Sequence, residues 1–190
     1  MDPDGRREWP VDSLFNGAQR RHENNYRTTR RPKHNGVDIN LGLGYDDLGA
    51  PIYATHDGIV TRLRRISDDN DGGGNRIQIK SKDGTVSTYF MHLYKIADIK
   101  VDEFISEGEL IGFLGGSGKG IENAYKPHLH YEIKVNGEYI NPAINPLTLV
   151  DPQKFITPIN LVVLCPAIII ESAKPLPNLI EYFKLHTNDE

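Results

Sequence analysis

Cysteine is nearly absent from the 190-residue chain, and its scarcity excludes several kinds of site. The single cysteine, Cys165, has no partner for an intramolecular disulfide, so a disulfide framework is excluded. A zinc site built from pairs of cysteines is excluded for the same reason. Because the chain has seven histidines and 26 Asp plus Glu residues, any metal site must use imidazole and carboxylate ligands.

Long apolar runs and a strong charge of one sign are also missing. The most apolar stretch, residues 159–170, has about twelve residues, whereas a membrane span needs about 20. We therefore expect no membrane insertion, and no signal peptide is recognisable near Met1. The formal charge of −4 does not favour nucleic-acid binding, which usually needs a basic surface.

The chain does contain short alternating segments separated by glycine turns. Residues 76–80 alternate apolar and polar side chains, turn at Asp83-Gly84, and return as a second β-rich run over residues 85–93. Residues 128–135 alternate again before Asn136-Gly137. Such runs joined by Asp-Gly or Asn-Gly turns are typical of antiparallel hairpins. The sequence therefore predicts a mainly β fold, either an antiparallel sheet or an open barrel.

Three regions differ in pattern along the chain. Residues 33–146 are predicted to form the β domain. Residues 1–32 are rich in arginine and lack a clear period, so we expect a basic, irregular N-terminal arm. Residues 147–190 are divided by prolines and are expected to pack on the domain as a C-terminal extension, with a short helix over residues 178–186.

Two short segments carry residues that can bind a metal ion together. The first is residues 34–38, HNGVD, in which His34 and Asp38 share one face of either a strand or a helix. The second is residues 127–132, PHLHYE, which is predicted to be a strand because Pro127 disfavours helix before it. In a strand, His128 and His130 point to the same side.

A catalytic zinc ion takes three protein ligands and keeps one position open for water. The spacing predicts such a site from His34, Asp38 and one of the two histidines His128 and His130. The other histidine of that pair, or His92 at the end of residues 85–93, is then available beside the metal as an acid–base group.

The order of these motifs resembles peptidase family M23, the zinc endopeptidases of the lysostaphin and LytM type that cut peptidoglycan. His-x-x-x-Asp, Tyr-x-x-His-Leu and His-x-His follow one another as in that family. Glycine-containing segments at residues 49–54, 57–60 and 107–112 match as well, and the resemblance covers residues 33–146.

The resemblance implies a fold and a role for each matched residue. It implies the duplicated hybrid motif of the M23 domain, with one Zn²⁺ ion held by His34, Asp38 and His130. It implies that His92 and His128 are the catalytic pair beside the metal. His56 replaces the small residue usual in the family, and we expect it to lie in a surface turn.

The activity that the resemblance implies is hydrolysis of peptide cross-links or stem peptides of bacterial peptidoglycan. The alternative is a catalytically silent member of the same fold that binds the cell wall or activates a hydrolase. Peptidoglycan lies outside the cytoplasm, so we expect the protein to act in the periplasm or cell wall. The export route stays open, and the alternatives include a secretion system and a phage tail.

The partners expected on the same basis are peptidoglycan peptides. Delivery machinery and an immunity or inhibitor protein stay open as further partners. A separate hypothesis concerns regulation, in which the N-terminal arm, with Asn24, Asn25 and Tyr26, covers the groove that binds the substrate peptide and occupies the open position of the zinc ion.

Overall fold

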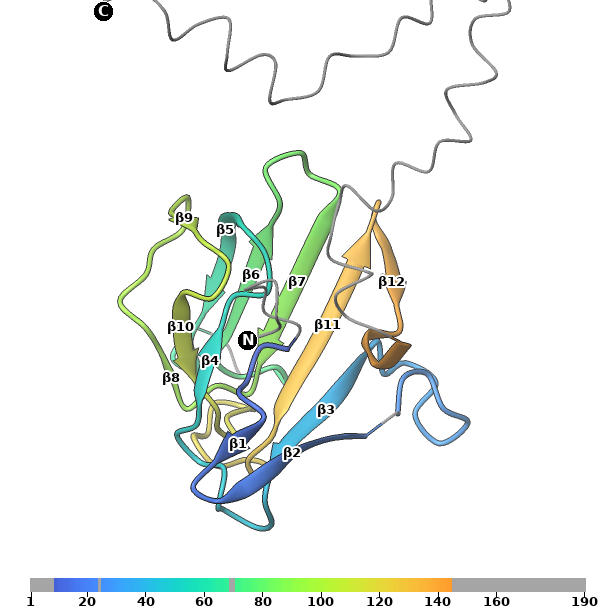
Figure 1. Ribbon diagram of the computed structural model, residues 1–190, viewed down its shortest axis with the longest axis vertical. Coiled ribbons are helices and arrows are strands. Elements are labelled where there is room, and N and C mark those ends of the chain that lie inside the picture. Colours follow the sequence, from blue (N-terminus) through green and yellow to red (C-terminus); the bar gives the residue numbers. More distant parts are fainter. Residues whose placement is uncertain (1–8, 24, 69–70, 145–190) are drawn as a thin grey trace, which may run out of the picture. The chain divides into compact units, whose positions relative to one another are not determined.

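The computed structural model describes residues 9–23, 25–68 and 71–144 (Figure 1). The chain divides into two units, Met1–Phe155 and Ile156–Glu190, and every described residue lies in the first. The C-terminal extension and its short helix lie outside the described residues, so the boundaries of the three regions stay a prediction. Among the described residues, no helix is long and apolar enough to cross a membrane.

Two open antiparallel sheets make up the described fold. The larger has the order β1-β2-β3-β11-β7-β6-β5-β9, with β12 paired to β11, and the smaller has the order β4-β10-β8. The strands of the larger sheet are β1 (Leu14–Phe15), β2 (Ala18–Glu23), β3 (Gly36–Leu41), β5 (Gly58–Arg64), β6 (Arg76–Lys80), β7 (Val86–Met91), β9 (Phe104–Ile105), β11 (Leu129–Val135) and β12 (Glu138–Ile140). Those of the smaller are β4 (Pro51–Tyr53), β8 (Lys95–Ile96) and β10 (Leu110–Phe113), and the short 3-10 helix Pro142–Ile144 ends the described chain. The predicted mainly β, antiparallel fold is confirmed.

Alternation along the central strand β11 separates an apolar face from a polar one. Leu129, Tyr131 and Ile133 are completely buried and belong to a core cluster that takes residues from both sheets. Burial of each such side chain contributes about 1.5–3 kcal/mol. His130 and Glu132 alternate with them and therefore lie on the opposite, polar face of the same strand.

Strands β1 and β2 lie in the N-terminal arm, so the prediction of an irregular arm is wrong for these residues. Strand β2 pairs with β3 and extends the large sheet, as Figure 1 shows. Before it, Trp9 and Val11 are buried in the core, and the Tyr53 N–H donates to the Pro10 carbonyl at 2.8 Å. The strand was not apparent in the sequence because charged side chains, common near sheet edges, hide its alternation.

His56 also differs from its prediction as a surface turn residue. Its side chain is buried, with Nδ1 2.8 Å from the Asp57 carbonyl and Nε2 3.0 Å from the Thr88 hydroxyl. Burial lowers the pKa of His56, so the ring is a neutral, hydrogen-bonded core residue. The chain bends at His56 before β5 begins at Gly58, but the sequence pattern carried no information about side-chain burial.

We expect Trp9→Ala to destabilise the domain by about 3 kcal/mol, because it leaves a cavity at the core. The indole ring stacks on His22 with centroids 4.6 Å apart, and these contacts are lost as well. Since Trp9 is the only tryptophan, urea unfolding should be followed by circular dichroism. Leu14→Ala, at a side chain 56% exposed, is the control. Equal unfolding midpoints for the two variants would contradict the account.

Candidate metal centre and active site

The pairing of β3 with β11 places Asp38 directly opposite His130. His34 lies just before β3, and its Nε2 is 3.0 Å from Asp38 Oδ1. His130 Nδ1 is 3.0 Å from the same oxygen. One ligand atom from each of the three residues lies within 4.8 Å of the other two. The structure thus brings together the three residues predicted as ligands.

Hydrogen bonds on the outer side of each ring orient the two imidazoles. His34 Nδ1 lies 3.2 Å from the Asn25 carbonyl, and because a carbonyl only accepts, this nitrogen is the N–H donor. His130 Nε2 donates to Glu132 Oε1 at 3.0 Å. Metal binding requires the two inner nitrogens to be deprotonated, and the lone pairs of His34 Nε2 and His130 Nδ1 then point toward Asp38 Oδ1. Metal-binding histidines are typically held in this way, with the other nitrogen donating to a carbonyl or carboxylate.

Gly36, between the two ligands in sequence, is required by close packing of the strands. It lies opposite Glu132, and a Cβ at this position would come 2.3 Å from the Tyr131 carbonyl oxygen. The glycine therefore lets β3 and β11 approach where Glu132 reaches back toward His130.

Asp38 is the centre of the hydrogen-bond network. Its Oδ2 accepts from the Asn25 amide at 2.8 Å and from Arg31 at 2.6 Å, which leaves Oδ1 directed at the two imidazoles. Burial by itself would raise the pKa of Asp38, but the hydrogen bonds from His130, His34 and Arg31 outweigh it and hold the pKa well below its usual range. The carboxylate is therefore charged, as a metal ligand must be.

The charge on His130 responds to the same neighbours. Burial opposes its charged form, but hydrogen bonds to Asp38 and Glu132 outweigh this and raise the pKa of His130 to about 9 in the metal-free site. A proton on Nδ1 thus occupies the position that a metal ion would take.

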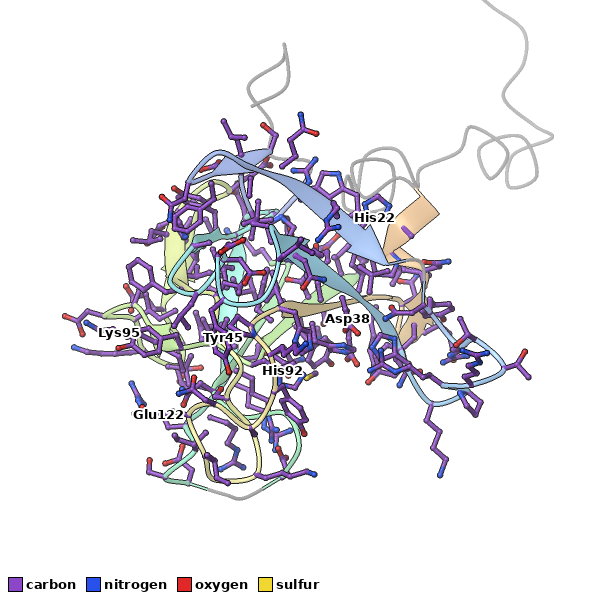
Figure 2. The ribbon with its side chains drawn as sticks, turned by 90° about the horizontal axis from the view of Figure 1, so that it is seen from below. His22, Asp38, Tyr45, His92, Lys95 and Glu122 are labelled. Atoms are coloured by element: carbon purple, nitrogen blue, oxygen red, sulfur yellow. The ribbon has the colours of Figure 1, made fainter. Side chains whose placement is uncertain are left out.

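Two further histidines stand beside this group. His128 Nε2 is 3.9 Å from Asp38 Oδ1, and its Nδ1 donates to the Lys126 carbonyl at 2.7 Å. The ring centroid of His92 is 4.7 Å from that of His128, and His92 Nδ1 donates to the Ser117 carbonyl at 3.0 Å. Because Nδ1 is the donor in each ring, the neutral form of either ring has its lone pair on Nε2. Figure 2 shows His92 near Asp38, with Lys95 and Glu122 toward the other side of the domain.

His92 is held in an unusual state. It follows β7 with a φ of 64°, a left-handed conformation that is costly for a residue other than glycine. Burial and the neighbouring His128 lower the pKa of His92 to about 3, so the ring is neutral near pH 7. The strained backbone at the end of β7 turns this ring toward the metal-binding group.

Sequence reasoning missed several residues that contact the site. Glu132 orients His130, and Asn25 and Arg31 bind Asp38 Oδ2. Tyr125 packs edge-on to His92 with ring centroids 4.8 Å apart. Only Glu132 had a detectable signal, because its even spacing from His130 places both on one strand face. Asn24 lies outside the described residues, and the hypothesis that the arm covers the groove stays a prediction.

The donor set fits zinc. Zn²⁺ accepts imidazole nitrogen and carboxylate oxygen, and a catalytic site needs three protein ligands. His34, Asp38 and His130 supply two such nitrogens and one oxygen, and each nitrogen is fixed by a hydrogen bond on the far side of its ring.

The fold and the site together define the class of protein: a mainly antiparallel β domain that carries a His/Asp/His group able to bind a metal ion. The model for Peptidase family M23 matches residues 32–142, which is more than half of the chain. The chain therefore belongs to peptidase family M23. The family is zinc-dependent.

Two curated relatives and one solved structure illustrate the similarity. Peptidoglycan DD-endopeptidase ShyC from Vibrio cholerae is 34% identical over 125 residues, which cover 65% of this chain and 27% of ShyC. Glycyl-glycine endopeptidase ALE-1 from Staphylococcus capitis is 32% identical over 114 residues, covering 60% of this chain and 28% of ALE-1. The chain therefore spans about a quarter of the length of these relatives. A zinc-containing peptidase from Vibrio cholerae has a TM-score of 0.52 at 25% identity, with 71% of this chain and 38% of that one covered.

We expect Glu132→Gln to weaken zinc binding by about tenfold or more, because the carboxylate holds the N–H of His130 and increases the basicity of its Nδ1. Zinc affinity is measured by competition with a chelator. Glu138→Gln, an exposed carboxylate on the neighbouring strand β12, is the matched control and should bind zinc as the wild type does. Unchanged affinity in Glu132→Gln would show that the carboxylate does not support the ligand.

Zinc affinity should also rise with pH. A metal ion must displace the proton from His130, whose pKa is raised to about 9, so affinity should increase by about tenfold per pH unit below that value. Calorimetry at pH 7 and 8 in buffers of different ionisation enthalpy should detect about one proton released per zinc. An affinity that does not change between these pH values would contradict the assignment.

Proposed function

We propose that this chain is a zinc metalloendopeptidase that hydrolyses peptide cross-links or stem peptides of bacterial peptidoglycan. The observation that carries the proposal is the His/Asp/His group with His92 and His128 beside it. Relatives named as a peptidoglycan DD-endopeptidase and a glycyl-glycine endopeptidase support the substrate class.

His34, Asp38 and His130 would hold the zinc ion through His34 Nε2, Asp38 Oδ1 and His130 Nδ1. A zinc ion in such a site lowers the pKa of its bound water and polarises the carbonyl of the scissile bond. His34 donates to the Asn25 carbonyl, Arg31 donates to Asp38, and His130 donates to Glu132. These hydrogen bonds keep the three ligand atoms directed at one point, which lowers the cost of ordering them.

His128 is the proposed general base. Its Nδ1 is committed to the Lys126 carbonyl, so the free lone pair on Nε2, on the side of Asp38, can accept a proton from the attacking water. The protonated ring can then pass that proton from Nε2 to the leaving amine.

His92 is proposed to assist His128 as a neutral hydrogen-bonding group. Because its pKa is lowered to about 3, His92 adds no positive charge to oppose protonation of His128. Its Nε2 lone pair can accept a hydrogen bond and so orient the water or the substrate amide. The bond from Nδ1 to the Ser117 carbonyl keeps that lone pair in place.

The proposed place of action follows from the substrate. Peptidoglycan lies in the periplasm or cell wall, so the enzyme must act there, and peptidoglycan peptides are its proposed partners. The export route, and any delivery machinery or immunity or inhibitor protein, stay open.

Substitutions should separate metal binding from turnover. We expect alanine at His34, Asp38 or His130 to abolish zinc binding and hydrolysis together. Alanine at His92 or His128 should retain zinc but lose at least about 100-fold in turnover. Zinc content is measured by elemental analysis, and turnover by mass spectrometry of peptides released from purified sacculi.

The matched control is His22→Ala, which removes an exposed histidine on β2 away from His92 (Figure 2). It should keep both zinc and turnover. If the zinc-loaded wild type binds sacculi tightly but releases no peptides, the proposal fails and a silent cell-wall-binding module is favoured.

A further inference from the structure

A small pocket lies on the large sheet next to the metal-binding group. The pocket has a volume of about 200 Å³, and its lining includes Arg62, Arg76, Gln78, Tyr89, Glu132 and Tyr139. We refer to it as the sheet pocket. Glu132 belongs to both places, since it lines the sheet pocket and accepts the hydrogen bond from His130. The pocket is therefore continuous with the metal-binding group.

Strand register explains why these side chains share one face. Arg62 pairs with Gln78 across β5 and β6, and Gln78 pairs with Tyr89 across β6 and β7. Tyr89 in turn pairs with Glu132 on β11. Directly paired residues project to the same side of a sheet, so the four form one row across four strands. A peptide that follows this row crosses the strands and ends beside His130.

The length of this row of four side chains matches that of a short peptide. Four neighbouring strands span three inter-strand spacings, or about 14 Å. An extended peptide covers that distance in about four residues. Arg62, at the far end of the row, can therefore reach a group within about four residues of the bond being cut.

The far end of the sheet pocket is cationic. Arg62 and Arg76 both line it, whereas Glu132, the carboxylate in the lining, lies at the end nearest the metal-binding group and is engaged by His130. Arg76 also pairs with Asp71. The Arg62 side chain is exposed on β5. The hydrogen bond from Arg76 is the main cause that lowers the pKa of Asp71; burial opposes it, and the charge of Arg62 makes a smaller lowering contribution. Guanidinium groups placed in this way suit the binding of a carboxylate.

Aromatic rings hold a further cation at the side of the sheet pocket. The Lys134 ammonium lies 4.2 Å from the centroid of Tyr139 and 5.7 Å from that of Tyr89. Lys134 follows Glu132 by two positions on β11 and therefore lies on the same face. The rings offer flat surfaces for a peptide backbone, and the ammonium adds positive charge beside them.

We infer that the sheet pocket is a carboxylate-binding subsite and that the preferred substrate is an acidic stem peptide. This inference rests on the proposed function and makes it more specific. Stem peptides of peptidoglycan carry free carboxylates along the chain, whereas a glycine bridge carries none. Arg62 would bind such a carboxylate while the scissile bond lies at the metal-binding group.

Binding of an uncleaved product peptide tests the subsite independently of catalysis. The probe is the tetrapeptide L-Ala-γ-D-Glu-meso-diaminopimelate-D-Ala, compared with its fully amidated form and with pentaglycine, by calorimetry with the full chain. The wild type should prefer the acidic peptide. Arg62→Gln should reduce this preference by about fivefold, the effect should weaken at high salt, and Arg62→Lys should restore part of it.

Lys95→Gln is the matched control, because it removes one positive charge from β8 in the smaller sheet, away from Asp38 (Figure 2). It should leave the preference unchanged. Equal binding of the acidic and amidated peptides by the wild type, or an unaltered preference in Arg62→Gln, would overturn the subsite. If the preference is present but no sacculus peptides are released, the subsite stands and the proposed hydrolysis fails.

Discussion

The antiparallel register between β3 and β11 is the constraint on which the site depends. It places Asp38 opposite His130 although the two residues are 92 positions apart in the sequence. A shift of one residue would move every side chain of β3 to the other face and direct Asp38 into the apolar core. The buried row on the opposite face of β11, with Leu129, Tyr131 and Ile133, therefore fixes the site as firmly as it fixes the fold.

A second consequence is electrostatic. Asp38 is buried, and a buried carboxylate is stable only when it is paired and hydrogen-bonded. In the metal-free protein, Arg31, His34 and His130 provide that pairing, and a proton on His130 supplies positive charge. A dication placed among the same atoms can take over this role, which explains how one arrangement is stable without the metal and suited to bind it.

Much of this fold could be predicted from the sequence because its signals are local. Alternation and the Asn-Gly turn predict β11 and its hairpin with β12, and the same alternation places His128, His130 and Glu132 on one face. The spacing in HNGVD predicts that His34 and Asp38 act together. Local spacing could not choose between His128 and His130 as the ligand, because that choice depends on which one lies opposite Asp38 in a distant strand.

Features set by distant contacts were not predictable. His56 lies in a sequence pattern typical of a turn, yet its side chain is buried and its Nε2 forms a hydrogen bond with the Thr88 hydroxyl. The sequence of β2 is typical of a charged, irregular arm, but its pairing with β3 makes it part of the large sheet. The role of Arg31 depends on the folding of the loop before β3, which has no periodic signal. Tertiary packing decided each of these cases.

The direct test of the central claim is a crystal structure of the zinc-loaded protein with anomalous scattering recorded at the zinc edge. The account predicts one zinc ion bound by His34 Nε2, Asp38 Oδ1 and His130 Nδ1, with His92 and His128 close to it but not bound. Zinc bound by His92 or His128, or held through His130 Nε2, would contradict it.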